Sequence, residues 1–215
     1  MLYTKLIKKA ISFSTRVHEI DQKQKRKGKD IAYIVHPLSV GLILAKAGAS
    51  DEIIAAGILH DTLEDSIASN KITKEILAKE FGDEVANLVD SVTEQNKELP
   101  WKVRKQLALD HIGSFSHGSL LVKSADIIDN AAELLEDCNI IGPNVFKRFN
   151  ASKELIIENY NNLITAILKK YKTNPLAPEL ICVRSKLLDI VSKQNGDTFM
   201  ERFMKALDDT QMDQY

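Results

Sequence analysis

Residues 53–65 change abruptly from apolar to charged, and this change constrains the fold more than any other part of the chain. Residues 53–59 are aliphatic or glycine, which is typical of a buried helix. They are followed at once by four ionisable residues, His60, Asp61, Glu64 and Asp65. A continuing helix would place His60 over Glu64, because residues four apart share one face. Such a group can bind a metal ion or move a proton.

Further candidate ligands lie far from this segment. A His-Asp pair alone has an equally simple explanation, a core histidine with a partner at an ordinary helix end. However, His36 precedes Pro37, and Asp126 lies within the strongly apolar residues 120–135. A carboxylate in that setting needs a partner or a ligand, because desolvation costs several kcal/mol. We therefore predict a metal site formed by His36, His60, Asp61 and Asp126, a mixed nitrogen and oxygen set that suits Mn²⁺, Fe²⁺ or Zn²⁺.

The order His, His-Asp, Asp resembles the HD superfamily of metal-dependent phosphohydrolases. Five ordered segments resemble, more narrowly, the hydrolase domain of the RelA/SpoT proteins: residues 26–28, 33–37, 59–65, 81–93 and 123–130. The resemblance covers about residues 7–171. A His-Asp pair alone is a weak signal, whereas five segments in the right order are specific.

The resemblance implies hydrolysis of guanosine tetra- or pentaphosphate (ppGpp, pppGpp) at the 3′-pyrophosphate, giving GDP or GTP and pyrophosphate. It also implies Mn²⁺ as the cofactor, which the spacing of the ligands leaves open. An ion of this kind lowers the pKa of a bound water and offsets charge on a phosphoryl oxygen. Glu64 and Asp65 would be catalytic residues that orient or deprotonate the attacking water. The alternative for both is a structural role at a helix end.

Cations are concentrated in residues 23–29, which could be an ordinary solvated loop. The resemblance instead implies that Arg26 packs on the guanine. The remaining predicted substrate contacts are Lys27 and Asn130 to the nucleoside and, less specifically, Lys97, Arg104 and Arg148 to phosphates. The chain departs from the family pattern at Ile127, Asp129 and Glu133, which leaves the exact nucleotide open.

Three alternatives remain open from the sequence. Similarity to the metazoan SpoT homologues, which are stand-alone small alarmone hydrolases, also implies the removal of the 2′-phosphate of NADPH. A general HD phosphohydrolase would act on another nucleotide or phosphate ester. A non-enzymatic alarmone sensor would bind without turnover, although the complete set of predicted ligands and carboxylates argues against it.

The composition of the chain limits which binding partners and which cellular compartment are expected. The net charge of −1 over 215 residues gives no electrostatic case for nucleic-acid binding, so we expect a small-molecule nucleotide as the partner. Lysines interrupt each apolar run near the N-terminus, and no segment reaches the roughly eighteen apolar residues of a membrane span. The distant Cys138 and Cys182 favour a reducing compartment. We expect a cytoplasmic protein without membrane contact; its oligomeric state is unspecified.

Helical spacing of apolar residues recurs along the whole chain, and no long alternating pattern indicates a sheet. The spacing predicts helices near residues 2–21, 36–48, 51–61, 73–81, 83–93, 101–112, 120–135, 151–171, 179–191 and 198–207. We expect an all-α fold, a single HD-domain helical bundle. Its predicted boundaries are residues 1–172 for the phosphohydrolase domain and residues 173–215 for a short helical extension packed on it.

Overall fold

The computed structural model describes residues 4–94 and 98–192, and this part of the chain is helical without a named strand. The α-helices are α1 (Lys5–Thr15), α2 (Val35–Lys46), α3 (Asp51–Leu59), α4 (Thr62–Asp65), α5 (Lys74–Phe81), α6 (Asp83–Val92), α7 (Trp101–His111), α8 (His117–Ile141), α9 (Lys153–Lys170) and α10 (Ala177–Ser192). The 3₁₀ segments are η2 (Ala68–Asn70), η3 (Ile112–Ser114) and η4 (Gly142–Arg148). The predicted all-α fold is confirmed.

Hydroxyl side chains begin several of these helices. Thr4, Ser50, Thr73, Ser116 and Ser152 each accept a hydrogen bond from the backbone N–H three residues on. An accepted bond of this kind satisfies one of the N–H groups that a helix start leaves unpaired. The helix boundaries therefore follow local chemistry that is readable in the sequence.

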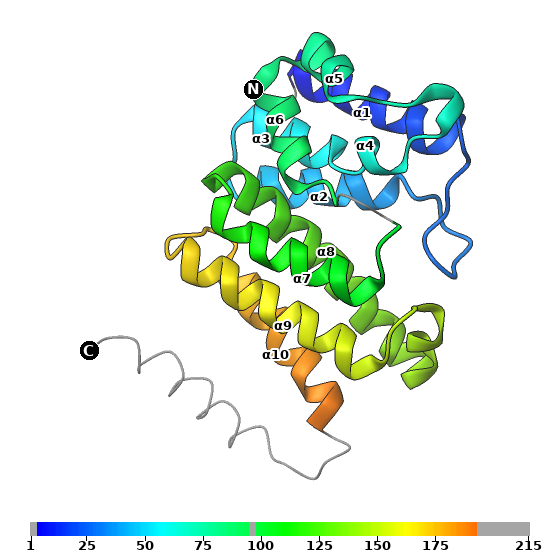
Figure 1. Ribbon diagram of the computed structural model, residues 1–215, viewed down its shortest axis with the longest axis vertical. Coiled ribbons are helices and arrows are strands. Elements are labelled where there is room, and N and C mark those ends of the chain that lie inside the picture. The colour runs from blue at the N-terminus through cyan, green and yellow to red at the C-terminus, as the bar shows by residue number, and fades with distance from the viewer. Residues whose placement is uncertain (1–3, 95–97, 193–215) are drawn as a thin grey trace.

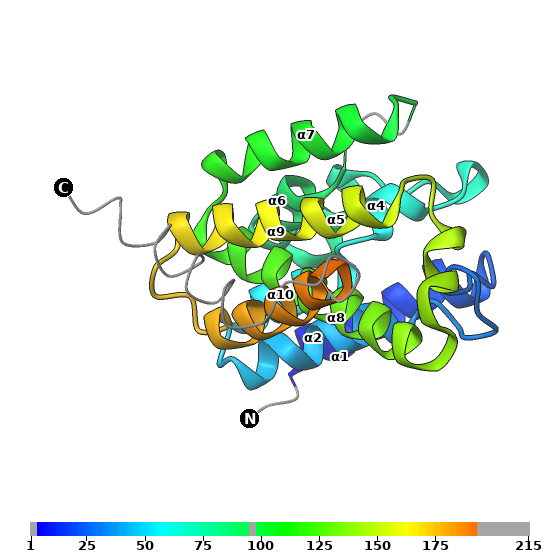
Figure 2. The ribbon, with the colours of Figure 1, turned by 90° about the horizontal axis from the view of Figure 1, so that it is seen from below.

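Helix α8 is the central element of the bundle (Figures 1 and 2). It contacts α2, α3 and α6 on one side and α9 and α10 on the other. Its buried side chains include Leu120, Val122 and Leu134, none more than 2% exposed. A residue on the middle of α8 is thus held by packing from several directions, and Asp126 occupies that position.

Two glycines allow α2 and α3 to approach closely. A Cβ at Gly57 would collide with Cδ1 of Leu44, and one at Gly41 would lie only 2.5 Å from Cγ1 of Ile58. The two helices are consecutive and joined by a short turn, so the start of α2 lies beside the end of α3. This close packing brings His36 and His60 together.

The first helix departs from its predicted form. Helical structure continues to Ile20, but residues Arg16–Ile20 form a π-helical segment, η1. Its wider turn is closed by the N–H of Asp21, which donates to the carbonyl of Arg16 at 2.9 Å. The short hairpin considered near residues 31–35 is reduced to one isolated bridge between Lys25 and Ala32.

Helix α10 belongs to the predicted C-terminal extension and packs against α8 and α9. Leu180, Val183 and Leu187 bury its inner face. The predicted helix near residues 198–207 lies outside the described residues, and the boundary at residue 172 stays a prediction. No helix in the described part of the chain has the length and apolar character needed to cross a bilayer.

Candidate active site

Four predicted ligands meet where α2, α3 and α8 converge. Oδ1 of Asp126 lies 3.4 Å from Nε2 of His36 and 3.9 Å from Nε2 of His60. Oδ2 of Asp61 lies 3.0 Å from Nε2 of His60 and 3.6 Å from Nε2 of His36. One donor atom from each of His36, His60 and Asp126 lies within 4.8 Å of the others. Residues separated by ninety positions in the sequence thus face one point.

Both imidazoles present the same ring nitrogen to that point. Nδ1 of His36 contacts Oδ2 of Asp129 at 2.6 Å, and Nδ1 of His60 contacts the carbonyl of Gly57 at 2.8 Å. Each outer partner accepts a hydrogen bond, which favours a proton on Nδ1 and leaves the Nε2 lone pair directed inward.

The arrangement fits a divalent cation. Nε2 of His60 is buried and makes no hydrogen bond to any described residue. Ligand bonds of about 2.0–2.2 Å place neighbouring donors around an ion roughly 3 Å apart, close to the spacings observed here. An inward lone pair without a hydrogen donor is satisfied by a metal ion.

The carboxylates of the cluster are held ionised. Lys123 and Asn130, one turn either side of Asp126 on α8, donate to its two oxygens at 2.8 and 2.6 Å. Burial alone would raise the pKa of Asp126, but Lys123 and the two imidazoles hold it well below its ordinary value. Burial likewise opposes ionisation of Asp61, and His60 and His36 nevertheless lower its pKa.

The pKa values of the two imidazoles are shifted upward, in the direction opposite to those of the carboxylates. Burial alone lowers the pKa of His36, but its contacts with Asp126 and Asp129 raise it to about 9. The pKa of His60 is also raised, because Asp61 outweighs the effect of burial. Carboxylates that favour positive charge on the rings equally favour a bound cation at the same place.

Tyr33 and Asp129 support the cluster, although the sequence assigned neither of them a role. The hydroxyl of Tyr33 donates to Oδ2 of Asp61 at 2.5 Å. The carboxylate of Asp129 forms a hydrogen bond with Nδ1 of His36. In the sequence, Asp129 was noted only as a departure from the family pattern. Its spacing of three residues from Asp126 places both on one face of α8, which is the signal that could have identified it.

The helix breaks within the charged segment, which corrects the expectation of one continuous helix. α3 ends at Leu59, His60 and Asp61 form a turn, and α4 begins at Thr62. The hydroxyl of Thr62 donates to the carbonyl of Leu59 at 2.7 Å and so stabilises this turn. His60 and Glu64 therefore belong to different elements.

Glu64 and Asp65 lie on α4 and bind to other segments. Oε2 of Glu64 accepts from the backbone N–H of Glu94 at 3.4 Å. Oδ2 of Asp65 accepts from Nε2 of Gln24 at 2.9 Å. Each carboxylate is thereby tied to a different segment that borders the cluster.

The predicted nucleoside contacts are linked to the ligand cluster. Arg26 donates through Nη2 to Oδ1 of Asn130 at 2.8 Å and through Nε to Glu133 at 2.7 Å. Asn130 in turn donates to Asp126. Glu133 also pairs with Lys29 at 2.9 Å. Arg26 is thus fixed against α8 by two side chains.

The other predicted substrate contacts are spread around this region. Lys27 is exposed, with Nζ 5.5 Å from the ring centre of Phe149. Arg148 pairs with Asp137 at 2.7 Å, and Arg104 pairs with Glu94. Lys97 lies outside the described residues.

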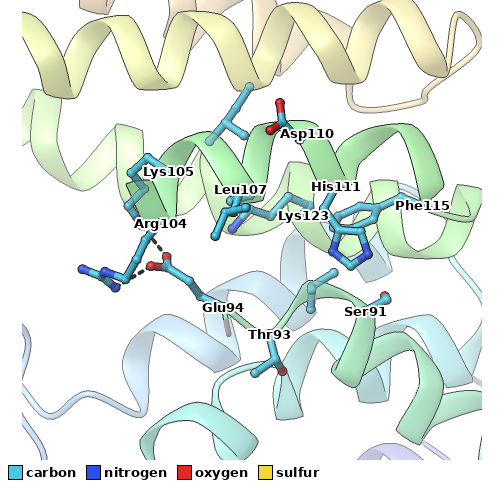
Figure 3. Close-up of a pocket in the computed structure, with 13 residues that line it drawn as sticks. Ser91, Thr93, Glu94, Arg104, Lys105, Leu107, Asp110, His111, Phe115 and Lys123 are labelled. Carbon is cyan, nitrogen blue, oxygen red and sulfur yellow. Dashed lines mark hydrogen bonds and ion pairs between the residues drawn. The ribbon is translucent and has the colours of Figure 1, made fainter. Parts of the chain in front are cut away.

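A cavity of about 470 Å³ lies between α6, α7 and α8. Lys123 lines it and also donates to Asp126, but none of the four proposed ligands lines the cavity itself. Arg104 and Lys105 extend from α7 and meet at Glu94, as Figure 3 shows. The lining thus holds the cations Arg104, Lys105 and Lys123 together with the carboxylates Glu94 and Asp110.

This helical fold with two inward imidazoles and two carboxylates is that of an HD domain, and the HD-domain family matches residues 10–111. The guanosine-3′,5′-bis(diphosphate) 3′-pyrophosphohydrolase MESH1 of Xenopus tropicalis is 35% identical over 131 residues, 60% of this chain and 69% of MESH1. The chain therefore belongs to the HD-domain family of the MESH1 proteins.

One further sequence relative and one solved structure are also similar to this chain. A GTP pyrophosphokinase of Myxococcus xanthus is 46% identical over 92 residues, which are 43% of this chain and 11% of that protein. A solved structure of a metazoan ortholog of SpoT, described as hydrolysing ppGpp, matches with a TM-score of 0.66. That match covers 89% of this chain and 97% of the other at 21% identity, and it establishes the fold.

Proposed function

We propose that the protein hydrolyses the 3′-pyrophosphate of guanosine-3′,5′-bis(diphosphate), and of the corresponding pentaphosphate, to give GDP or GTP and pyrophosphate. The observation that carries the proposal is the convergence of His36, His60 and Asp126 donors within 4.8 Å, beside the anchored Arg26. The names of the MESH1 relatives support the choice of substrate.

We propose His36, His60, Asp61 and Asp126 as ligands of one divalent ion, with Mn²⁺ as the metal and Fe²⁺ or Zn²⁺ as alternatives. A bound ion of this class polarises a phosphoryl oxygen and acidifies a water. The contribution of the chain is to keep both carboxylates ionised and both Nε2 atoms directed inward, which supports the assignment.

Glu64 and Asp65 are the proposed catalytic carboxylates, which orient the attacking water and accept its proton. Their place on α4, directly after the Asp61 turn, supports this role. The water oxygen forms a bond to the 3′-phosphorus as the bond from that phosphorus to the 3′-oxygen breaks. The 3′-oxygen takes up the proton, which gives free pyrophosphate and a nucleotide with a 3′-hydroxyl.

Arg26, Lys27 and Asn130 are the proposed nucleoside contacts, and Lys97, Arg104 and Arg148 are the proposed phosphate contacts. The planar guanidinium of Arg26 suits stacking on a base, and its bonds to Asn130 and Glu133 reduce the entropy lost on binding. The partner is a small nucleotide rather than nucleic acid, and the proposed compartment is the cytoplasm. The free thiols of Cys138 and Cys182 support a reducing environment.

The direct test is incubation of the purified protein and Mn²⁺ with guanosine tetraphosphate, with products followed by ³¹P NMR. We expect pyrophosphate and GDP in equal amounts, and their loss in His60→Ala and after chelation. Metal-loaded protein that releases no pyrophosphate would contradict the proposal. NADPH and a simple phosphate ester in the same assay distinguish the alternative substrates.

Arg26→Ala tests the nucleotide specifically. We expect a KM for guanosine tetraphosphate at least about tenfold higher, because a stacked and hydrogen-bonded cation contributes on the order of 1–2 kcal/mol. Lys25→Ala is the matched control, since Lys25 is exposed and pairs only with Asp30 among the ion pairs of the described chain. Equal effects of the two substitutions would argue for a general phosphohydrolase.

A further inference from the structure

We infer that Gln24 and His18 are positioning residues that fix the carboxylate of Asp65. Nε2 of Gln24 donates to Oδ2 of Asp65 at 2.9 Å, and Oε1 of Gln24 lies 2.8 Å from Nδ1 of His18. The three side chains form one hydrogen-bonded series from the first helix to α4. The inference rests on the proposed function, in which Asp65 acts on the attacking water.

The direction of each hydrogen bond in the series follows from chemistry. An ionised carboxylate only accepts hydrogen bonds, so the NH₂ end of Gln24 must face Asp65. The carbonyl end of the same amide then faces His18, and Nδ1 of His18 must carry the proton. One orientation of the amide satisfies both contacts, and the flipped amide would set oxygen against oxygen.

His18 is suited to hold that orientation because it is rigid and neutral. Its side chain is fully buried, and the ring of Tyr33 lies 5.1 Å away. Burial lowers the pKa of His18. Nε2 of His18 is buried and bonds to no described residue, so no acceptor there competes with Gln24 for the proton of the ring.

The backbone of Gln24 is fixed on both sides. Its N–H donates to the carbonyl of His18 at 2.8 Å, and its carbonyl accepts from the N–H of Tyr33 at 2.8 Å. His18 itself lies in the π-helical segment η1, and such wide turns are frequent at functional sites. The segment thus holds the donor to Asp65 through side chain and backbone together.

The test is steady-state hydrolysis of guanosine tetraphosphate by Gln24→Met, which keeps the length of the side chain but removes both hydrogen bonds. We expect kcat to fall about 10- to 100-fold with KM within about twofold, because a misplaced base affects the chemical step more than binding. Gln22→Met is the matched control: Gln22 lies two residues away and donates to the carbonyl of Val17 at 3.0 Å. We expect its kcat to stay within about twofold of the wild type.

Two further variants separate positioning from stability. In an Asp65→Asn background, Gln24→Met should cause little additional loss, because both changes remove one function. His18→Phe should lower kcat, and His18→Asn should restore part of it by returning an N–H donor near Nδ1. Losses that multiply in the double variant, or a Gln24→Met enzyme that only melts earlier, would overturn the inference.

The side-chain amide of Gln24 supplies a readout that needs no activity. Its ¹⁵N-attached protons should exchange slowly in the wild type and shift in both His18→Phe and Asp65→Asn. A wild type without turnover but with this coupled signal would refute the proposed function and leave the inference standing. An amide signal that is insensitive to both substitutions would overturn the inference itself.

Discussion

The carboxylate of Asp129 lies 2.6 Å from Nδ1 of His36, on the side of the ring opposite the ligand cluster. Such an outer carboxylate fixes the tautomer of a ligating imidazole and raises its basicity. In this chain, α8 therefore provides both a cluster residue, Asp126, and the support for another, His36.

Asp129→Asn should weaken metal binding by roughly 10- to 100-fold, because the ring exchanges a charged acceptor for a neutral amide that makes it a less basic ligand. Calorimetric titration of the metal-free protein with Mn²⁺ measures the change. Asp30→Asn is the control, because Asp30 is exposed and lies outside the cluster. Unchanged affinity in Asp129→Asn would show that the contact does not support the ligand.

Metal stabilisation should increase between pH 6.5 and about 9, the ordinary and shifted pKa values of His36. In the metal-free protein, a raised pKa stabilises the fold below pH 6.5, and this contribution is lost as the pH rises through about 9. Metal binding needs the unprotonated ring, so it competes with that proton at the lower pH. The measurement is the melting temperature with and without Mn²⁺ across this window, and a constant difference would contradict the expectation.

Gly57→Ala should destabilise the protein by about 1–3 kcal/mol and weaken metal binding with it. The added methyl group would collide with Cδ1 of Leu44, and relief of the collision moves the end of α3 that carries His60. Gly113→Ala is the control, because an added Cβ there meets nothing within 4 Å. Urea unfolding of both variants, with metal titration beside it, gives the comparison.

We propose that residues 173–215 form an extension that stabilises the domain, and α10 supplies the test. Leu187 is 1% exposed, so Leu187→Ala should cost about 2–5 kcal/mol of unfolding free energy. Ile181 on the same helix is 47% exposed, and Ile181→Ala should cost less than about 1 kcal/mol. Similar small losses in both variants would mean that α10 is only loosely attached.

The sequence predicted the convergence of His36, His60 and Asp126, because each stood in a recognisable segment and Asp126 needed a partner in an apolar setting. It did not predict the contacts of Gln24, Tyr33 and Asp129. The contacts of Gln24 and Tyr33 depend on side-chain orientation between segments that are distant in the chain, which no periodicity encodes. Asp129 did carry a signal, its spacing of three residues from Asp126 on one helix face.

The break between α3 and α4 was also missed, since the apolar pattern leading to His60 gives no stop signal. The hydroxyl of Thr62 donates to the carbonyl of Leu59 at the break, and a local hydrogen bond of this kind competes with helix propagation. The π-helical turn at Arg16–Ile20 is a similar case, because its altered hydrogen bonding leaves the apolar spacing almost unchanged.

The hydrogen-bonded path from Asp126 through Asn130 to Arg26 has a thermodynamic consequence. Metal binding at Asp126 or nucleotide binding at Arg26 alters the electrostatic environment of the same side-chain amide, that of Asn130. We expect the ion and the nucleotide to act as mutual effectors, each changing the other's affinity by an identical factor, as reciprocity requires. Depletion of the ion would then alter nucleotide recognition as well as turnover.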